Sequence, residues 1–277
     1  MTSIDREPSV GPSGVVPTAR GERRWRRRGV LAAGALLLVP GAPQRAFAFG
    51  EDGAFNPRIL RTGTAPFQGV RTRAPARWSL EVVRRTSAPA RVAPTEVRAD
   101  EPKLLEEPFA VWAGAKAPEP LTRSEVRGLR QFLALGGVLL VDDSAPATGK
   151  FMSAAKRQLQ RVLPMLAPID VGPENVVFRS YYLLRRAVGR VAGSGKLGAL
   201  VQSGSIRVLL SSYDLLGALA RQPGGVHPLE VVPGGAAQRE QAIRLAVNIA
   251  MYVLCSDYKD DQVHAPALMR RRAMEQP

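Results

Sequence analysis

Two runs of apolar residues, separated by a segment in which apolar positions recur every three or four residues, predict a strand–helix–strand unit in the middle of the chain. The first run, 108–113, is closed by Gly114, and the second, 138–141, is apolar throughout. Continuous apolar runs of this length are typical of strands buried on both faces. The segment between them, 122–133, has the spacing of one helix face. We therefore expect a right-handed βαβ unit with parallel strands.

Signals for both ends of this helix support the unit. Thr122 is a residue type that caps helices, and Glu125 stands three positions later, which is the pattern of a capping box. Gly136 and Gly137 follow the last apolar helical position and are expected to end the helix. Both ends of the helix can therefore be predicted from local sequence.

Similar patterns predict the remaining elements. The longest amphipathic run, 236–254, is expected to be a helix, and the apolar runs 196–201 and 206–211 are expected to pair as strands. We also expect a helix over 150–163, an edge strand over 92–97, a strand or a helix end over 77–83, and a strand or a packed loop over 180–184. The fold class that follows is α/β, with three layers around a mainly parallel sheet.

The composition divides the chain into four parts. Residues 1–48 are predicted to be a disordered leader followed by a signal peptide, and 49–75, rich in Gly and Pro, an extended arm. The α/β domain is expected over 76–256, and a polar, basic tail over 257–277. A domain of this length is sufficient for one α/β unit with a single sheet.

Residues 21–48 carry the three parts of an export signal. A block of arginines that ends in Arg27 and Arg28 precedes an uncharged apolar run, and Ala48 closes a small-x-small pattern after which a signal peptidase would cut. The arginine pair, followed by a glycine and two apolar residues, favours the twin-arginine route, with general export as the alternative.

An uncleaved membrane anchor is the competing interpretation of the same segment. The apolar run 29–39 is about half as long as the ~20 residues that a membrane span needs, and extending it would bury Arg45. We therefore expect export to the periplasm or cell envelope. Membrane association is then expected only through an uncleaved signal or through the basic tail.

The net charge of +15 is unevenly distributed. Residues 1–48 contain eight arginines and two acidic residues, so the rest of the chain carries +9. Only six of the 39 basic residues are lysines, a bias that a GC-rich genome explains as well as nucleic-acid binding does. No zinc spacing, RNA-binding motif or basic stretch interleaved with aromatic residues is present, so nucleic acid is not an expected partner.

Asp142 and Asp143 are the sharpest candidates for chemistry, because they directly follow the predicted strand 138–141. The carboxyl ends of parallel strands are where open α/β sheets bind ligands. With Asp214, which follows the predicted strand 206–211, they could act as an acid/base pair or bind a cation. The alternative is that each carboxylate caps a local turn or helix, which is common for Asp at such positions.

Four further residues complete the candidate sites. His227 lies in a glycine-containing loop and could join these carboxylates, but no second ligand stands at zinc spacing, so no metal site is predicted. Ser211 with Asp214 and His227 lacks the Gly-x-Ser-x-Gly elbow of serine hydrolases. Arg179 and Tyr182 could orient an anionic ligand; the alternative is that Tyr182 packs with its hydroxyl at the rim of the domain.

The lone cysteine and the glycine-rich stretches give weaker indications of function. Cys255 excludes an internal disulfide, and its place in an apolar helical run predicts a buried small side chain. The stretches 189–198 and 224–235 lack the spacing of a phosphate-binding loop, so no cofactor is predicted.

Several short segments, in a fixed order, match a known family. They are Phe55-Asn-Pro-Arg58, 121–143, Phe178-Arg-Ser-Tyr-Tyr182, Ser211-Ser-Tyr-Asp-Leu215 and Arg244-Leu-Ala-Val-Asn-Ile-Ala-Met-Tyr252. On these segments the chain resembles the bacterial domain-of-unknown-function family DUF4159, across residues 53–273. The resemblance implies a class I glutamine-amidotransferase-like (flavodoxin-like) α/β fold and a link to the cell envelope. It also implies MoxR-type ATPases and von Willebrand factor A-domain proteins as neighbours and candidate partners.

True amidotransferases of that fold place a nucleophilic Cys at a sharp strand-to-helix elbow. Neither predicted strand end carries a Cys, and Cys255 belongs to the last helix. We therefore expect a non-catalytic exported domain that binds a ligand or a protein partner in the envelope. The alternative is a hydrolase-like or metal-dependent enzyme that uses Asp142, Asp143, Asp214 and His227.

Overall fold

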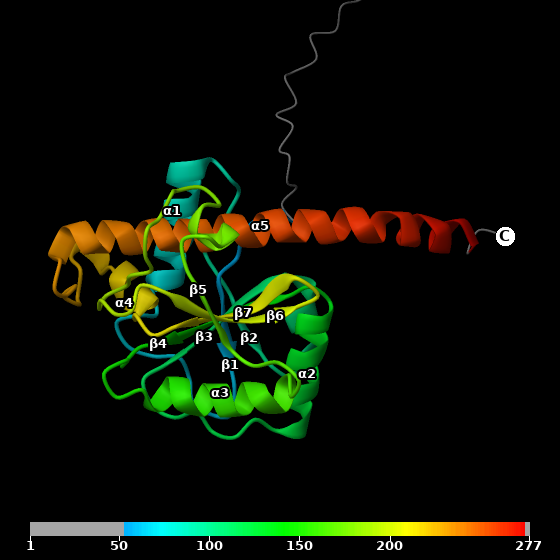
Figure 1. The fold of residues 1–277 in the computed structure, drawn as a ribbon, viewed down its shortest axis with the longest axis horizontal. Coiled ribbons are helices and arrows are strands. Elements are labelled where there is room, and N and C mark those ends of the chain that lie inside the picture. The colour runs from blue at the N-terminus through cyan, green and yellow to red at the C-terminus, as the bar shows by residue number, and fades with distance from the viewer. Residues whose placement is uncertain (1–52, 275–277) are drawn as a thin grey trace, which may run out of the picture. The chain divides into compact units, whose positions relative to one another are not determined.

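The described part of the protein is built around one seven-stranded sheet (Figure 1). The structure, a computed structural model, describes residues 53–274, with side chains described from 53 to 256. The predicted leader and signal peptide, including Arg27, Arg28 and the cleavage after Ala48, lie outside the described residues.

The sheet is mainly parallel, as predicted. Its strands are ordered β2-β1-β3-β4-β7-β6-β5. Their bounds are β1 Arg58–Arg61, β2 Glu96–Arg98, β3 Phe109–Gly114, β4 Val138–Asp143, β5 Ile169–Val171, β6 Leu197–Gln202 and β7 Ser205–Ser211. The strands from β2 to β7 in this order are parallel, and β6 and β5 extend the sheet with antiparallel pairings.

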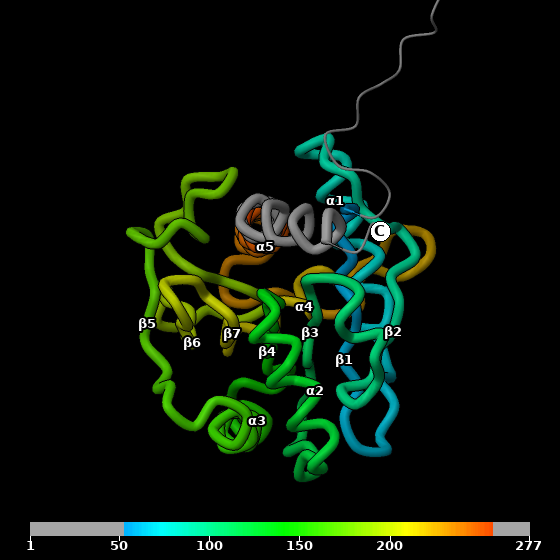
Figure 2. The backbone as a smooth tube through the Cα atoms, turned by 90° about the vertical axis from the view of Figure 1, so that its right-hand side faces the viewer, coloured from blue at the N-terminus to red at the C-terminus, as the bar shows by residue number. Residues whose placement is uncertain are grey.

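Helices cover both faces of the sheet, which makes three layers (Figure 2). The first face carries α1 Ala74–Thr86, α4 Leu215–Leu219 and α5 Gly235–Met274, which contact one another. The other face carries α2 Arg123–Ala134 and α3 Lys150–Val162. Short 3₁₀ helices lie in the connections between the described elements: η2 Pro102–Glu106, η3 Val176–Phe178 and η4 Pro223–Gly225. The prediction of a three-layer α/β fold is confirmed.

Each layer of helices closes its own hydrophobic core. In β4, Val138 and Leu140 contribute to the core beneath α1, α4 and α5, whereas Leu139 and Val141 contribute to the core beneath α2 and α3. All four side chains are almost completely buried. This is why the run is apolar throughout: both faces of a central parallel strand are covered.

The predicted βαβ unit is confirmed at its caps as well as in its elements. Thr122 accepts a hydrogen bond from the backbone N–H of Glu125 at 3.2 Å, and the Glu125 carboxylate accepts one from the backbone N–H of Thr122 at 2.8 Å. This reciprocal pair starts α2. The hairpin β6–β7 and helix α3 are also present. The edge strand predicted over 92–97 is shorter and shifted, since β2 spans only Glu96–Arg98.

The predicted extended arm over 49–75 is wrong at 58–61, which form β1 within the sheet. β1 pairs with β2 on one side and β3 on the other, and Ile59 and Leu60 are buried. Four residues are too few to show a strand pattern, and the pairing that stabilises them comes from distant segments. The α/β domain therefore begins well before residue 76.

Three other segments resolve open alternatives or differ from the prediction. The segment 77–83 is the interior of α1, where Trp78 is fully buried and donates its indole N–H to the Ala246 carbonyl at 2.8 Å. The segment 180–184 is a loop in which Leu184 is buried and Tyr181 and Leu183 are exposed. The helix predicted to end at residue 254 continues to Met274 in α5, so the polar tail is helical over most of its length.

Candidate functional site

Asp142 is fully buried near the end of β4 and bonds to the element that follows β7. Its Oδ1 accepts hydrogen bonds from the Ser211 hydroxyl at 2.8 Å and from the Leu215 N–H at 2.9 Å. Its Oδ2 accepts one from the Leu216 N–H at 2.8 Å. Because β4 pairs with β7 so that Asp142 lies opposite Ser211, this carboxylate caps the start of α4 from a neighbouring strand.

Burial raises the pKa of Asp142 from 3.8 to about 7, and the nearby negative charge of Asp214 adds to the rise. The hydrogen bonds from Leu216, Leu215 and Ser211 oppose the shift because they stabilise the ionised form. A shift of this kind is frequent at functional sites, although buried structural networks produce it too.

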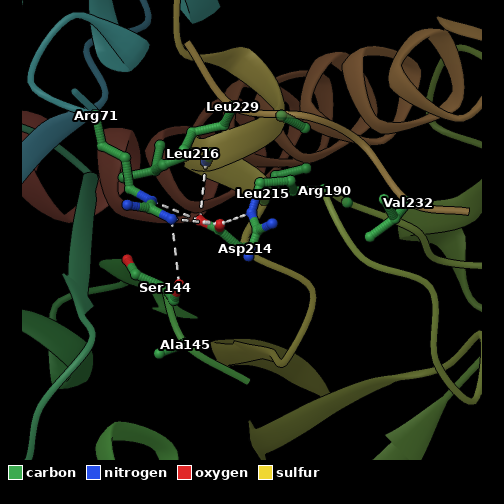
Figure 3. Close-up of polar contacts among 12 residues, drawn as sticks. Arg71, Ser144, Ala145, Arg190, Asp214, Leu215, Leu216, Leu229 and Val232 are labelled. Carbon is green, nitrogen blue, oxygen red and sulfur yellow. Dashed lines mark hydrogen bonds and ion pairs between the residues drawn. The ribbon is translucent and has the colours of Figure 1, made fainter. Parts of the chain in front are cut away.

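Asp214 is also fully buried and forms ion pairs with two arginines. It caps α4 through a 3.0 Å hydrogen bond from the Gly217 N–H, with a left-handed φ of 52°. Arg71 donates Nε and Nη2 to its two oxygens, at 2.7 and 2.5 Å, and Arg190 donates its Nε. Figure 3 shows Arg71 reaching this carboxylate and the backbone carbonyl of Ser144, which accepts from Nη2 at 3.2 Å. The hydrogen bond to Asp214 raises the pKa of Arg71, so this guanidinium stays charged.

The other two predicted catalytic residues are bonded elsewhere. Asp143 accepts hydrogen bonds from the backbone N–H groups of Ala145 at 2.9 Å and Met152 at 3.4 Å, as a turn cap would. His227 Nδ1 lies 3.0 Å from the Ala220 carbonyl oxygen, and burial lowers the pKa of its ring. Among the described residues, no hydrogen bond joins His227 to any of the three aspartates. The structure thus brings Asp142 and Asp214 together and leaves Asp143 and His227 in local contacts.

The residues predicted to orient an anion, Arg179 and Tyr182, lie away from these carboxylates. Arg179 donates Nη2 to the Pro173 and Glu174 carbonyls, at 3.1 and 2.6 Å. The Tyr182 ring lies 5.2 Å from the guanidinium carbon of Arg244 on α5. Both residues therefore belong to the surface beside α5.

A cavity of about 620 Å³ lies at the carboxyl ends of β1 and β3. The connection after β1, up to Arg71, and the connection after β3, 113–119, form its walls. In the parallel part of the sheet, the chain leaves β1 toward β2 on one side and then returns to β3 on the other. Ligands of open α/β sheets bind at such a switch point, where the strand order reverses.

The cavity combines aromatic surface with positive charge. Phe67, Trp112 and Phe151 line it, and the last two rings meet edge to face at 5.7 Å between centroids. Arg61, Arg71 and Lys116 are the cations of its lining, and Glu119 is its carboxylate. Arg61 lies 3.5 Å from Glu96 and Arg71 is paired with Asp214, so among the described residues Lys116 is the cation of the lining without an ion-pair partner. Asp142, Asp143, Asp214 and His227 are not among its lining residues. No local pattern in the sequence marks this site, because its position follows from the strand order.

A comparison with protein families matches residues 59–254 to the family described as Domain of unknown function (DUF4159). The chain belongs to the DUF4159 family. The matched range includes every residue that lines the 620 Å³ cavity and also the Asp142–Asp214 network. A comparison with curated proteins finds no match.

In this DUF4159 chain the free cysteine, Cys255, is exposed on α5. The prediction of a buried side chain is wrong: the neighbouring Leu254 is buried, whereas Cys255 lies on the exposed side of the helix. Within the described residues, no three His, Cys, Asp or Glu side chains gather closely enough to hold a metal ion. No helix in that part of the chain has both the length and the apolar character of a membrane span.

Proposed function

We propose that this DUF4159 chain is a ligand-binding domain of the cell envelope, and that a small anionic ligand with an apolar part occupies the cavity at the ends of β1 and β3. The observation that carries the proposal is the place of the cavity at the switch point of the sheet. Its volume of about 620 Å³ suits a small molecule. The envelope location rests on the signal pattern of residues 21–48.

The polar groups of the cavity favour an anion. Asp214 occupies the Nε–Nη2 edge of Arg71, and among the described residues Nη1 has no hydrogen-bond partner. An arginine fixed along one edge offers its remaining N–H groups in a set direction, which suits a carboxylate or phosphate oxygen. Lys116 adds an exposed cation to the same cavity, and the Glu119 carboxylate already accepts a hydrogen bond from Thr64 at 2.8 Å.

Binding fits this arrangement better than catalysis. Both oxygens of Asp142 accept hydrogen bonds from inside the protein, and Asp214 is neutralised by Arg71 and Arg190. The raised pKa of Asp142 is the one observation in favour of acid/base chemistry. However, its carboxyl group is fully buried, so a ligand in the cavity would not touch it.

Fluorescence of Trp112 tests the proposal. The full chain is titrated with phenyl phosphate, which carries an aromatic ring and an anion, and with phenol, which lacks the anion. Phenyl phosphate should give a saturable change and bind roughly ten-fold or more tightly than phenol, because hydrogen bonds to a charged group contribute about 1.5–3 kcal/mol. Trp112→Phe should remove the signal.

Matched lysine variants locate the bound probe. Lys116→Gln should weaken binding of phenyl phosphate, whereas Lys103→Gln, which removes an exposed lysine outside the cavity, should leave it unchanged. Equal effects of the two variants, or no saturable change with either probe, would contradict the proposal.

A further inference from the structure

The connection between β5 and β6 belongs to a long stretch of the chain without acidic residues. From 175 to 213 there are six basic residues and no Asp or Glu. Arg190 is paired with Asp214, and Arg207 is largely buried. The other four, Arg179, Arg185, Arg186 and Lys196, are exposed. A strongly basic surface therefore lies on one connection of the fold.

Large apolar side chains are exposed between these cations. Leu183 is 87% exposed, Val176 54% and Tyr181 45%. We call 176–186 the apolar-basic loop. Figure 2 shows this stretch, in light green between β5 and β6, standing out from the sheet beside α5. Scattered exposed apolar residues need no explanation, but three within eleven residues, interleaved with arginines, form a patch of mixed character.

The loop holds Leu183 outward through fixed neighbours. The backbone N–H and carbonyl of Tyr182 both bond to the side chain of Asn248 on α5, at 2.7 and 2.8 Å. On the other side, the N–H of Leu184 bonds to the Phe178 carbonyl at 2.8 Å, and Leu184 itself is buried. Because the residues before and after it are anchored, Leu183 is exposed by the structure of the loop and not by fraying.

The cations of the patch are available to an external anion. Among the described residues, Arg185, Arg186 and Lys196 have no ion-pair partner. A hydrogen bond of 2.7 Å from the Ala187 N–H to the Gly195 carbonyl holds Lys196 near Arg186. The nearest acid along the chain is Glu174, whose carboxylate accepts a hydrogen bond from the Gly172 N–H at 2.9 Å. One carboxylate leaves the four exposed cations with a net positive charge.

We propose that the apolar-basic loop docks onto an anionic phospholipid surface. Leu183 would enter the headgroup region, and Arg185, Arg186 and Lys196 would contact lipid phosphates. Tyr181 stays bound to the protein, because its hydroxyl donates a hydrogen bond to the Arg85 carbonyl. Apolar side chains that dip into the interface, beside cations that reach anionic headgroups, are the two contributions that hold peripheral proteins on membranes. An acidic protein would match the charge of the loop. However, one exposed leucine cannot bury the roughly 800 Å² per partner that a standard protein interface buries.

Vesicle sedimentation with the full chain tests this surface. We expect sedimentation with vesicles that contain phosphatidylglycerol and none with pure phosphatidylcholine, at about 0.1 M salt, where the Debye length is about 10 Å. Arg185→Gln with Arg186→Gln should lower the partition coefficient roughly 30-fold, since each cation contributes about five-fold near an anionic surface. Leu183→Ser should weaken binding several-fold and leave the salt dependence unchanged.

Variants on the opposite face of the sheet provide matched controls. Arg123→Gln with Arg127→Gln removes two exposed charges from α2, and Leu135→Ser removes a leucine that is 64% exposed. Both should sediment like the unmodified chain. Retained binding in the loop variants would assign the membrane contact to another part of the chain and overturn the proposal. Absence of binding to phosphatidylglycerol vesicles, or equal binding to polyglutamate that is insensitive to Leu183→Ser, would also overturn it.

Discussion

Replacing Asp142 with Asn should remove a pH dependence of folding stability that one buried carboxyl group creates. The pKa of Asp142 is raised from 3.8 to about 7 in the folded chain, so the folded state holds this proton more tightly than the unfolded state. The stabilisation is complete below pH 3.8 and is lost as the pH rises through 7. A rise of about 3 pKa units corresponds to roughly 4 kcal/mol, and more than half of this stabilisation is lost between pH 5 and pH 8.

Urea unfolding followed by circular dichroism, repeated from pH 5 to pH 8, measures this effect as a difference between two proteins. The amide nitrogen of Asn cannot accept the hydrogen bond from Leu216. The free energy of unfolding of Asp142→Asn should therefore be lower by about 1–3 kcal/mol at every pH. The slope with pH is therefore the test. From pH 5 to pH 8 the free energy of unfolding of the unmodified chain should fall by roughly 2–3 kcal/mol more than that of the variant. Added salt should leave this difference intact, since it screens exposed charges and not buried ones.

Parallel pH profiles for the two proteins would refute the reasoning, because the carboxyl would then titrate alike in the folded and unfolded chains. Ser211→Ala gives a second check. It removes a hydrogen bond that stabilises the ionised form of Asp142, so the loss of stability should move to higher pH. A move to lower pH would show that the Ser211 hydroxyl acts in the opposite sense.

Three further substitutions test other parts of the fold by unfolding measurements. Arg58 is buried and donates hydrogen bonds to four backbone carbonyls in the segment from η2 to β3. Arg58→Lys should therefore lower the free energy of unfolding by about 3 kcal/mol. An unchanged free energy of unfolding would mean that Lys can satisfy those carbonyls. Thr122→Ala should lower the free energy of unfolding by about 1 kcal/mol, because it removes the cap of α2. Thr72→Ala, which changes a threonine at an exposed turn, is the matched control and should have a smaller effect. Glu240, whose pKa hydrogen bonds from Arg85 lower to about 2, contributes stability that is present above pH 4.5 and lost as the pH falls through 2. Glu240→Gln should therefore flatten the acid side of the stability profile, and an unchanged acid transition would contradict this origin.

The elements that sequence analysis predicted correctly are those with local signals. The capping box at Thr122 and the apolar run 138–141 are complete within a few residues of sequence, and both are present as expected. β1 was missed because its four residues are stabilised by β2 and β3, which lie at least 35 residues further along the chain. Its two adjacent apolar residues, Ile59 and Leu60, are too few to show the alternation of apolar and polar positions that marks a strand.

The candidate site was only partly predictable for the same reason. That Asp142 and Asp214 stand at neighbouring strand ends follows from local patterns and the general rule for parallel sheets. Their role as internal caps depends on the pairing of β4 with β7 and on Arg71, which lies in a connection with no sequence motif. The cavity depends on the position of β1 next to β3, which neither composition nor spacing reveals.

Arg71 also has a consequence for how this fold can diversify. It ties the far end of the connection after β1 to Asp214, on the other side of the strand ends. The residues between Thr62 and Arg71 are mostly exposed, and they wall the cavity without contributing to the sheet. Insertions or deletions there would reshape the cavity, while β1 holds one end of the segment in place and the ion pair holds the other. A lineage that conserves this ion pair, together with Phe67, which packs against the core beneath α1, α4 and α5, could thus exchange ligands by changing the rest of a single loop.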